Sequence, residues 1–129
     1  MSHDITLLPE SNVCIFTFHE GWDTAAGVEK RAQDVKRILA EVEKPVFLVM
    51  NLSEVRMTLD GVVRSANRLA RGPDAPFHHP MCRGVALVTT ERIAQMVARG
   101  LQTETFGNLR VCVCSDVEEA IQRAQEGNG

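Results

Sequence analysis

The sequence predicts a single α/β domain over residues 1–129, with a largely parallel sheet and helices packed on it. Residues 46–50 and 84–89 are continuous apolar runs, which favour strands covered on both faces. Apolar residues at helical spacing follow each run, which indicates strands alternating with helices. The runs at 5–8 and 13–18 are so close together that they predict an antiparallel hairpin at the sheet edge. The expected order is β-β-α-β-α-β-α-β-α.

The first helix is expected to begin after Asp23 or Thr24, either of which can cap it, and to end near Glu43 before Pro45. Its spacing predicts a buried stripe of Val28, Ala32, Val35, Ile38, Leu39 and Val42. The side facing water is predicted to hold Glu29, Lys30, Asp34, Lys36 and Arg37.

The second helix has a start and a stop signal. Thr58 is the expected N-cap, Gly72 supplies the left-handed position after the helix, and Pro73 prevents continuation. The predicted buried positions are Leu59, Val62, Val63, Ala66, Leu69 and Ala70.

The rest of the chain repeats this pattern. Residues 72–81 are rich in proline and predict an irregular loop. Thr90 is expected to cap a third helix that ends before Gly107, and residues 109–114 form the last strand. Ser115 and Glu118 form a capping box for a final helix, and residues 125–129 are expected to fray. The predicted buried positions of these two helices are Ile93, Met96, Val97, Leu101, Val117, Ala120, Ile121 and Ala124.

Composition excludes several classes of function. The net charge of −3 lacks the basic footprint of a protein that binds nucleic acid or an anionic membrane. No apolar run approaches the roughly 20 residues needed to cross a bilayer, so membrane insertion is not expected. The first ten residues lack the basic end and apolar stretch of a signal peptide, so we expect a cytoplasmic protein with reduced thiols.

The sequence contains no common catalytic or cofactor motif. It has no P-loop, G-x-G-x-x-G, G-x-S-x-G, C-x-x-C or H-E-x-x-H pattern. His78, His79 and Cys82 cluster in the proline-rich loop, but their spacing does not match a common zinc site. We therefore predict a protein without enzymatic activity, cofactor or metal.

The strongest candidate site is the polar elbow that joins the strand at 46–50 to the second helix. In an open α/β sheet, ligands bind in the crevice beyond the carboxyl ends of the strands. Arginines recur at helical spacing after the elbow, on the side of the second helix opposite its apolar stripe; the alternative interpretation of this side is a solvated face. The candidate partner-binding residues are Asn51, Ser53, Arg56, Thr58, Asp60, Gly61, Arg64 and Arg68, with Arg71 extending the arginine row.

The order of elements and the stretch FLVMNLSEVRMTLDGVVRSANRL resemble a STAS domain, the fold of bacterial anti-sigma-factor antagonists and of cytoplasmic domains of sulphate transporters. Leu52 and Ser53 match part of the family's Asp-Leu-Ser segment, and Gly61 matches the glycine that opens its helix. The C-terminal VALVTT and FGNLRVCVCSDVEEAIQRA are similar to the family's final strands and helix. Asn51 replaces the usual aspartate, and Asp60 stands where the antagonists carry a phosphorylated serine.

The resemblance implies a regulatory module that docks a protein partner, such as an anti-sigma factor, a kinase-like protein or a larger regulatory complex. It implies that the phosphorylation switch is absent at Asp60, while Ser53 and Thr58 stay possible acceptors. The longer proline-rich loop is similar to broader STAS and lipid-carrier-like relatives, so the alternative function is a carrier or sensor of a small apolar ligand such as a lipid. The oligomeric state stays open, a homodimer included.

Overall fold

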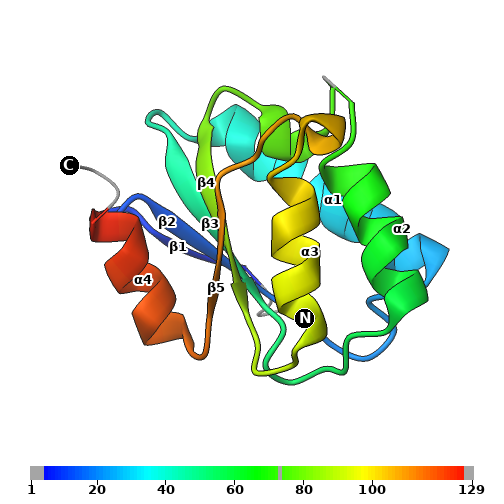
Figure 1. Cartoon of the computed structure of the whole chain (residues 1–129). Helices are drawn as coiled ribbons and strands as arrows, with labels where there is room; N and C mark the ends of the chain where they lie inside the picture. Colours follow the sequence, from blue (N-terminus) through cyan, green and yellow to red (C-terminus); the bar gives the residue numbers. More distant parts are fainter. Residues whose placement is uncertain (1–4, 73, 127–129) are drawn as a thin grey trace.

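The structure is a computed structural model that describes residues 5–72 and 74–126. Its elements follow the predicted order (Figure 1): β1 (Ile5–Leu8), β2 (Val13–Thr17), α1 (Ala25–Glu41), β3 (Val46–Asn51), α2 (Leu59–Leu69), β4 (Cys82–Val88), α3 (Ile93–Leu101), β5 (Val111–Cys114) and α4 (Val117–Glu126). Two short 3-10 helices, η1 (Pro76–His78) and η2 (Glu104–Phe106), lie in the connections. The predicted stop at Pro73 and residues 127–129 of the predicted tail lie outside the described residues, whereas residues 125 and 126 of that tail belong to α4.

The strands form one five-stranded sheet in the order β1-β2-β3-β4-β5. β1 pairs with β2 antiparallel, and the three other pairs are parallel. The predicted α/β class with an antiparallel hairpin at one edge is therefore confirmed. Among the described residues, no helix has both the length and the apolar character needed to cross a bilayer.

The central strand β3 is buried on both faces, as its continuous apolar run predicts. None of its residues from Val46 to Met50 is more than 5% exposed. Leu48 and Met50 pack in the cluster under α1, α2 and α3, whereas Phe47 and Val49 pack in the cluster under α4. Figure 1 shows α4 on one side of the sheet and the other three helices on the opposite side.

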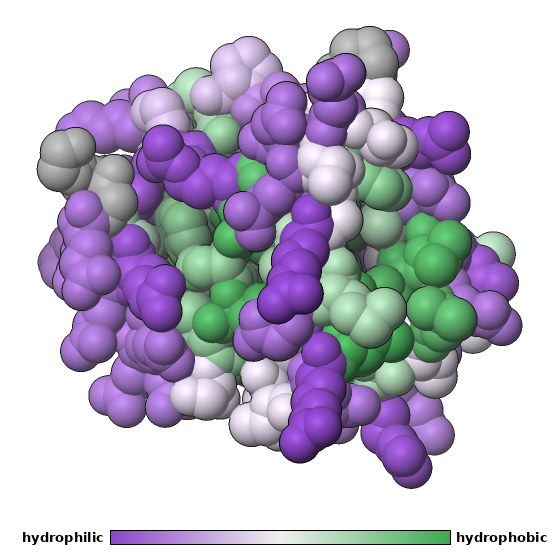
Figure 2. Space-filling view, in the orientation of Figure 1, coloured by the Kyte–Doolittle hydropathy of each residue, from purple (hydrophilic) through white to green (hydrophobic). Residues whose placement is uncertain are grey.

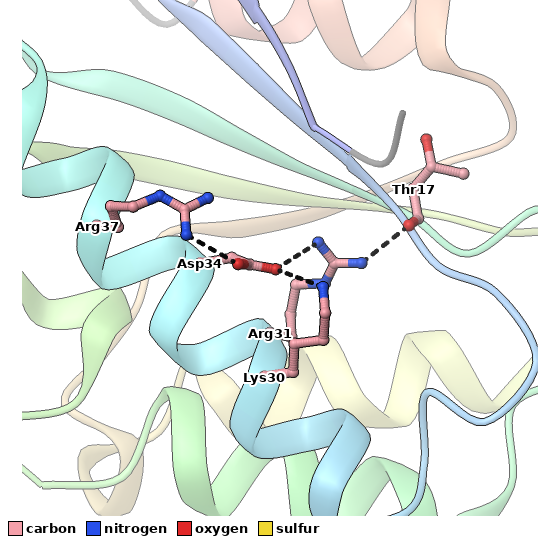
Figure 3. Close-up of polar contacts among 5 residues, drawn as sticks. All are labelled: Thr17, Lys30, Arg31, Asp34 and Arg37. Carbon is pink, nitrogen blue, oxygen red and sulfur yellow. Dashed lines mark hydrogen bonds and ion pairs between the residues drawn. The ribbon is translucent and has the colours of Figure 1, made fainter. Parts of the chain in front are cut away.

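The first helix contains a buried ion network that the sequence did not predict (Figure 3). Asp34 is only 7% exposed, so its expected place on the water-facing side is wrong. Its carboxylate accepts from Arg31 at 3.5 Å and from Arg37 at 3.3 Å. Arg31 also donates to the carbonyl of Thr17 at 3.0 Å, which ties α1 to the end of β2. A buried carboxylate is tolerated because these cations pair with it.

Helix starts differ from the sequence-based expectation in two places. Thr90 does not cap α3, which begins at Ile93 after Arg92 without a side-chain cap. The capping box of α4 is shifted by one residue: Asp116 accepts from the amide of Glu119 at 2.8 Å, and the carboxylate of Glu119 accepts from the amide of Ser115 at 2.9 Å. The strand bounds also move by two residues, with β4 beginning at Cys82 and β5 at Val111.

Candidate functional site

The elbow after β3 is a tight turn held by its own side chains. Asn51 ends the strand, and its side-chain oxygen accepts from the amide of Ser53 at 3.2 Å and from the hydroxyl of Ser53 at 2.7 Å. Such an Asx turn replaces ladder hydrogen bonds where the strand stops. Leu52 stays buried and donates its amide to the carbonyl of Val88, so the turn remains fastened to the sheet.

Thr58 caps α2 as predicted and also connects the elbow to the loop before α1. Its hydroxyl oxygen accepts from the amide of Gly61 at 3.1 Å and donates to the carboxylate of Asp23 at 3.1 Å. The amide of Met57 donates to the carboxylate of Glu91 at 2.9 Å. The elbow is therefore fixed from both sides, by the loops that follow β2 and β4.

The start of α2 passes close to the start of α1 at Gly61. A Cβ atom built on Gly61 would lie 2.4 Å from the Cβ of Asp23 and 2.7 Å from the hydroxyl oxygen of Thr58. Only glycine fits at this distance. Thr24 caps α1 in the same way that Thr58 caps α2, by accepting from the amide of Gly27 at 2.9 Å.

A polar crevice lies between these two loops, at the carboxyl ends of β2 and β3. It encloses about 490 Å³ and is lined by Glu20, Asp23, Glu54 and Arg56 among others. Within residues 5–72 and 74–126, no three side chains of the kinds that bind metals come together. His78 and His79 instead contact backbone groups, the carbonyl of Ala70 at 2.7 Å and the amide of Met81 at 3.0 Å.

The arginines of α2 do not form the free row that their spacing predicts. Arg64 donates to the carbonyl of Asp23, and Arg68 donates to the two carboxylate oxygens of Glu29 at 2.7 and 3.1 Å. The hydrogen bonds from Arg68 and Gln33 lower the pKa of Glu29 to about 2. Arg68 therefore connects α2 to α1, and Arg64 connects α2 to the loop before α1, although Arg64 stays exposed as its spacing predicts.

The predicted site residues thus divide into three groups. The structure brings together Asn51 with Ser53, and Thr58 with Gly61. Arg56 and Asp60 are exposed, and their side chains make no hydrogen bond or ion pair with the described part of the chain. Arg68 lies farther along α2, beside Glu29.

An apolar groove between α2 and α3 is the feature that sequence reasoning missed. Leu59, Val63 and Met96, all predicted to be buried, are 62%, 49% and 68% exposed. They line a groove of about 200 Å³ together with Phe106 of η2. Figure 2 shows the corresponding apolar surface over α2 and α3. Helical spacing identifies the apolar side chains of a helix but not whether a neighbour covers them. It therefore predicts burial for these exposed side chains as well.

A small cavity lies beneath this groove, between α2 and the sheet. It holds about 50 Å³ and is lined almost entirely by apolar side chains, among them Met50, Met57 and Leu87. Groove and cavity share four lining residues, which are Val62, Ala66, Val97 and Leu101. These four side chains form the wall between the groove and the cavity.

The thiols of Cys14, Cys82 and Cys114 are poor nucleophiles in this structure. Burial raises the pKa of Cys14 and of Cys82 to about 11. Burial and the neighbouring Cys112 raise the pKa of Cys114 to about 12. The sulfur atoms of Cys112 and Cys114 are 3.9 Å apart and not bonded. Since the thiolate is the reactive form, these sites favour a packing role.

Comparisons with models of protein families, with curated proteins and with solved structures gave no match to this chain.

Proposed function

We propose that this chain is a non-enzymatic binding module that docks a protein partner on the elbow and on the groove between α2 and α3. One observation carries the proposal. Of the four large hydrophobic side chains exposed among the described residues, Leu59, Val63 and Met96 surround this groove. Apolar side chains gathered on one exposed surface are typical of an interaction site.

The shape and charge of the groove indicate the chemistry of the partner. A groove between two helices suits the apolar face of an amphipathic segment. Arg92, the residue just before α3, lies four residues before Met96, and Arg99 of α3 lies three residues after it. Neither forms an ion pair within the described residues. They therefore flank the same helix face. We infer that the partner presents an apolar segment bordered by acidic residues, and that these charges raise the association rate.

The elbow contributes polar contacts at the end of the groove. Asp60 follows Leu59 directly and is exposed, as is Arg56 in the crevice between the loops. Asp60 gives this surface a permanent negative charge at the position where the STAS antagonists, which the sequence resembles, carry a phosphorylated serine. We therefore propose that docking here does not require a kinase.

A carrier of a small apolar ligand is the second candidate, because the groove and the cavity share a wall of apolar side chains. The small volume of the cavity makes this carrier function the second candidate and not the first. A ligand site normally encloses about 300–1,000 Å³, whereas the cavity holds about 50 Å³. Filling it with a lipid requires α2 to move outward. Native mass spectrometry of freshly purified protein that detects a bound lipid would favour this candidate.

The proposal is tested by measuring affinity for a partner that the native protein captures and that mass spectrometry identifies. Leu59→Ser and Met96→Ser remove apolar contact from the groove. Leu7→Ser is the matched control, because Leu7 is also exposed, at 43%, but lies on the edge strand β1. The groove variants should weaken binding about tenfold or more, since each removes a large apolar contact. Equal affinities of all three variants and the native protein would show that the partner binds elsewhere.

A further inference from the structure

Another pocket lies on the α4 side of the sheet, at the amino ends of β4 and β5. It encloses about 150 Å³, and three arginines line it: Arg83 near the start of β4, Arg110 just before β5, and Arg123 of α4. No carboxylate is among the described residues that line it. This collection of cations stands out in a chain with 14 basic and 17 acidic residues.

Arg83 is placed in the pocket by a β-bulge. Val46 pairs with Cys82 and the next residue, Phe47, pairs with Gly84, so Arg83 is an extra residue in β4. Bulges redirect a side chain at the rim of a sheet. The guanidinium lies 5.5 Å from the centre of the Phe47 ring and donates to the carbonyls of Ala124, Ser11 and Asn12. These bonds fix Arg83 as a rigid wall.

Gly84 makes room for the Phe47 ring and for the stem of Arg110. A Cβ atom at Gly84 would lie 2.6 Å from the Phe47 ring and 3.5 Å from Cδ of Arg110, so the ring and the Arg110 stem lie over bare backbone. The amide of Val85 donates to the carbonyl of Arg110 at 3.0 Å, which fixes the start of the Arg110 side chain. The backbone positions of Arg83 and Arg110 are therefore set by the sheet.

The positive charge in the pocket is largely uncompensated. Arg110 forms no ion pair with any described residue, and Arg123 reaches only Glu119, at 3.6 Å on the exposed side of α4. Burial, and then the charge of Arg110, lower the pKa of Arg83. Three guanidinium groups around one space repel one another unless an anion neutralises them.

We propose that this pocket binds a small anion that carries a phosphate group, with Arg83 as a fixed wall and Arg110 and Arg123 as the groups that close on the ligand. One bidentate arginine satisfies a carboxylate, whereas a phosphate offers oxygens to several guanidinium groups at once. The site lies on the opposite face of the sheet from the α2–α3 groove, so this proposal does not depend on the proposed docking function.

The test is a calorimetric titration of the full chain at low salt with pyrophosphate, inorganic phosphate and adenosine monophosphate. Arg110→Gln and Arg123→Gln should each weaken binding about tenfold or more, because each removes a charge-assisted hydrogen bond. Arg92→Gln and Arg99→Gln are the matched controls and should bind as the native protein does, because these exposed arginines lie just before α3 and in its last turn, outside the pocket. Tighter binding of the nucleotide than of inorganic phosphate would identify a phosphate ester as the ligand, and equal binding would identify the free ion.

Cys112 lines the same pocket and reports on its occupancy. Bound pyrophosphate should slow alkylation of Cys112 in the native protein and not in the Arg110→Gln variant. Three results would overturn the proposal: no saturable binding in the native protein, equal weakening in the α3 controls, or alkylation of Cys112 that pyrophosphate leaves unchanged.

Discussion

Gly61 is the residue on which the approach of α1 and α2 depends. Its missing side chain lets the first turn of α2 lie against Asp23 and Trp22, and it donates its amide to the cap residue Thr58. Gly100 of α3 offers a contrast, because a Cβ atom there would meet nothing within 4 Å. The two glycines therefore occupy helices for different reasons.

Replacing each glycine with alanine should change stability in opposite directions. Alanine favours a helix interior by about 1 kcal/mol over glycine, so Gly100→Ala should stabilise the protein by about 0.5–1 kcal/mol. Gly61→Ala should destabilise it, by about 1–3 kcal/mol, because the new methyl group would lie 2.4 Å from the Cβ of Asp23. Urea denaturation of both variants measures the difference. A Gly61→Ala protein as stable as the native one would contradict the close approach of the helices.

At the scale of elements, α1 and α2 are joined by the ion pair between Glu29 and Arg68. The pKa of Glu29 is lowered to about 2 in the folded protein, against roughly 4.3 in an unfolded chain. The pair therefore adds stability that is fully present above about pH 4.3 and is lost as the pH falls toward about 2. Because the Glu29 side chain is 52% exposed, this contribution is small.

Arg68→Gln should lower the free energy of unfolding at neutral pH and flatten its decline between about pH 4.3 and the folded pKa of about 2. The measurement is the urea midpoint as a function of pH. Arg99→Gln is the control, because this exposed arginine has no ion pair within the described residues. Parallel curves for native protein and Arg68→Gln would mean that the pair does not form in solution.

The central strand should be the element least tolerant of lost volume. Leu48 is fully buried in the middle of β3, so Leu48→Ala should cost about 2–5 kcal/mol through lost transfer energy and the remaining cavity. Leu7→Ala on the exposed edge strand should cost less than about 1 kcal/mol. Chemical denaturation compares the two. Similar costs would contradict the central position of β3.

Element order was predictable from the sequence because it depends on local signals. The run at 46–50, the cap at Thr58 and the glycine at Gly72, whose φ is +90°, all act within a few residues. The orientation of helix faces was not predictable in the same way. Leu59 and Met96 are apolar at core spacing yet exposed, and Asp34 is charged yet buried, because distant neighbours decide coverage. The arginine pocket requires a bulge that no local pattern indicates.

At the scale of the whole molecule, the two candidate sites lie on opposite faces of one sheet. The elbow lies at the carboxyl end of β3, and the apolar groove extends from it along α2 and α3 on the side of α1, α2 and α3. The arginine pocket lies at the amino ends of β4 and β5 beneath α4. β3 and β4 connect the two sites and are the best-buried strands. A rigid centre with a site on each face permits both to be occupied together.

α1 and α2 bury different numbers of residues, which leads to a prediction for the hydrogen exchange of their amides. Among the described residues, α1 buries six side chains, and Arg31 ties it to β2. The shorter α2 buries only Gly61, Val62 and Leu69, and it lies over a cavity of about 50 Å³. Local opening is easiest where few apolar contacts must break. We therefore expect amides of α2 to exchange faster than those of α1, and both faster than those of β3.

Mass spectrometry of peptides from the exchanging protein measures this order directly. A partner seated in the α2–α3 groove would add apolar contacts to α2 and should slow its exchange, while exchange in α1 should change little. A ligand that enters the cavity should also slow exchange in α2. Because α2 must first open to admit it, the binding rate should reach a limit as the ligand concentration is raised, and the rate of that opening sets the limit. Exchange in α2 as slow as in β3 would show that this helix is as firmly seated as the core and would contradict entry of a ligand beneath it.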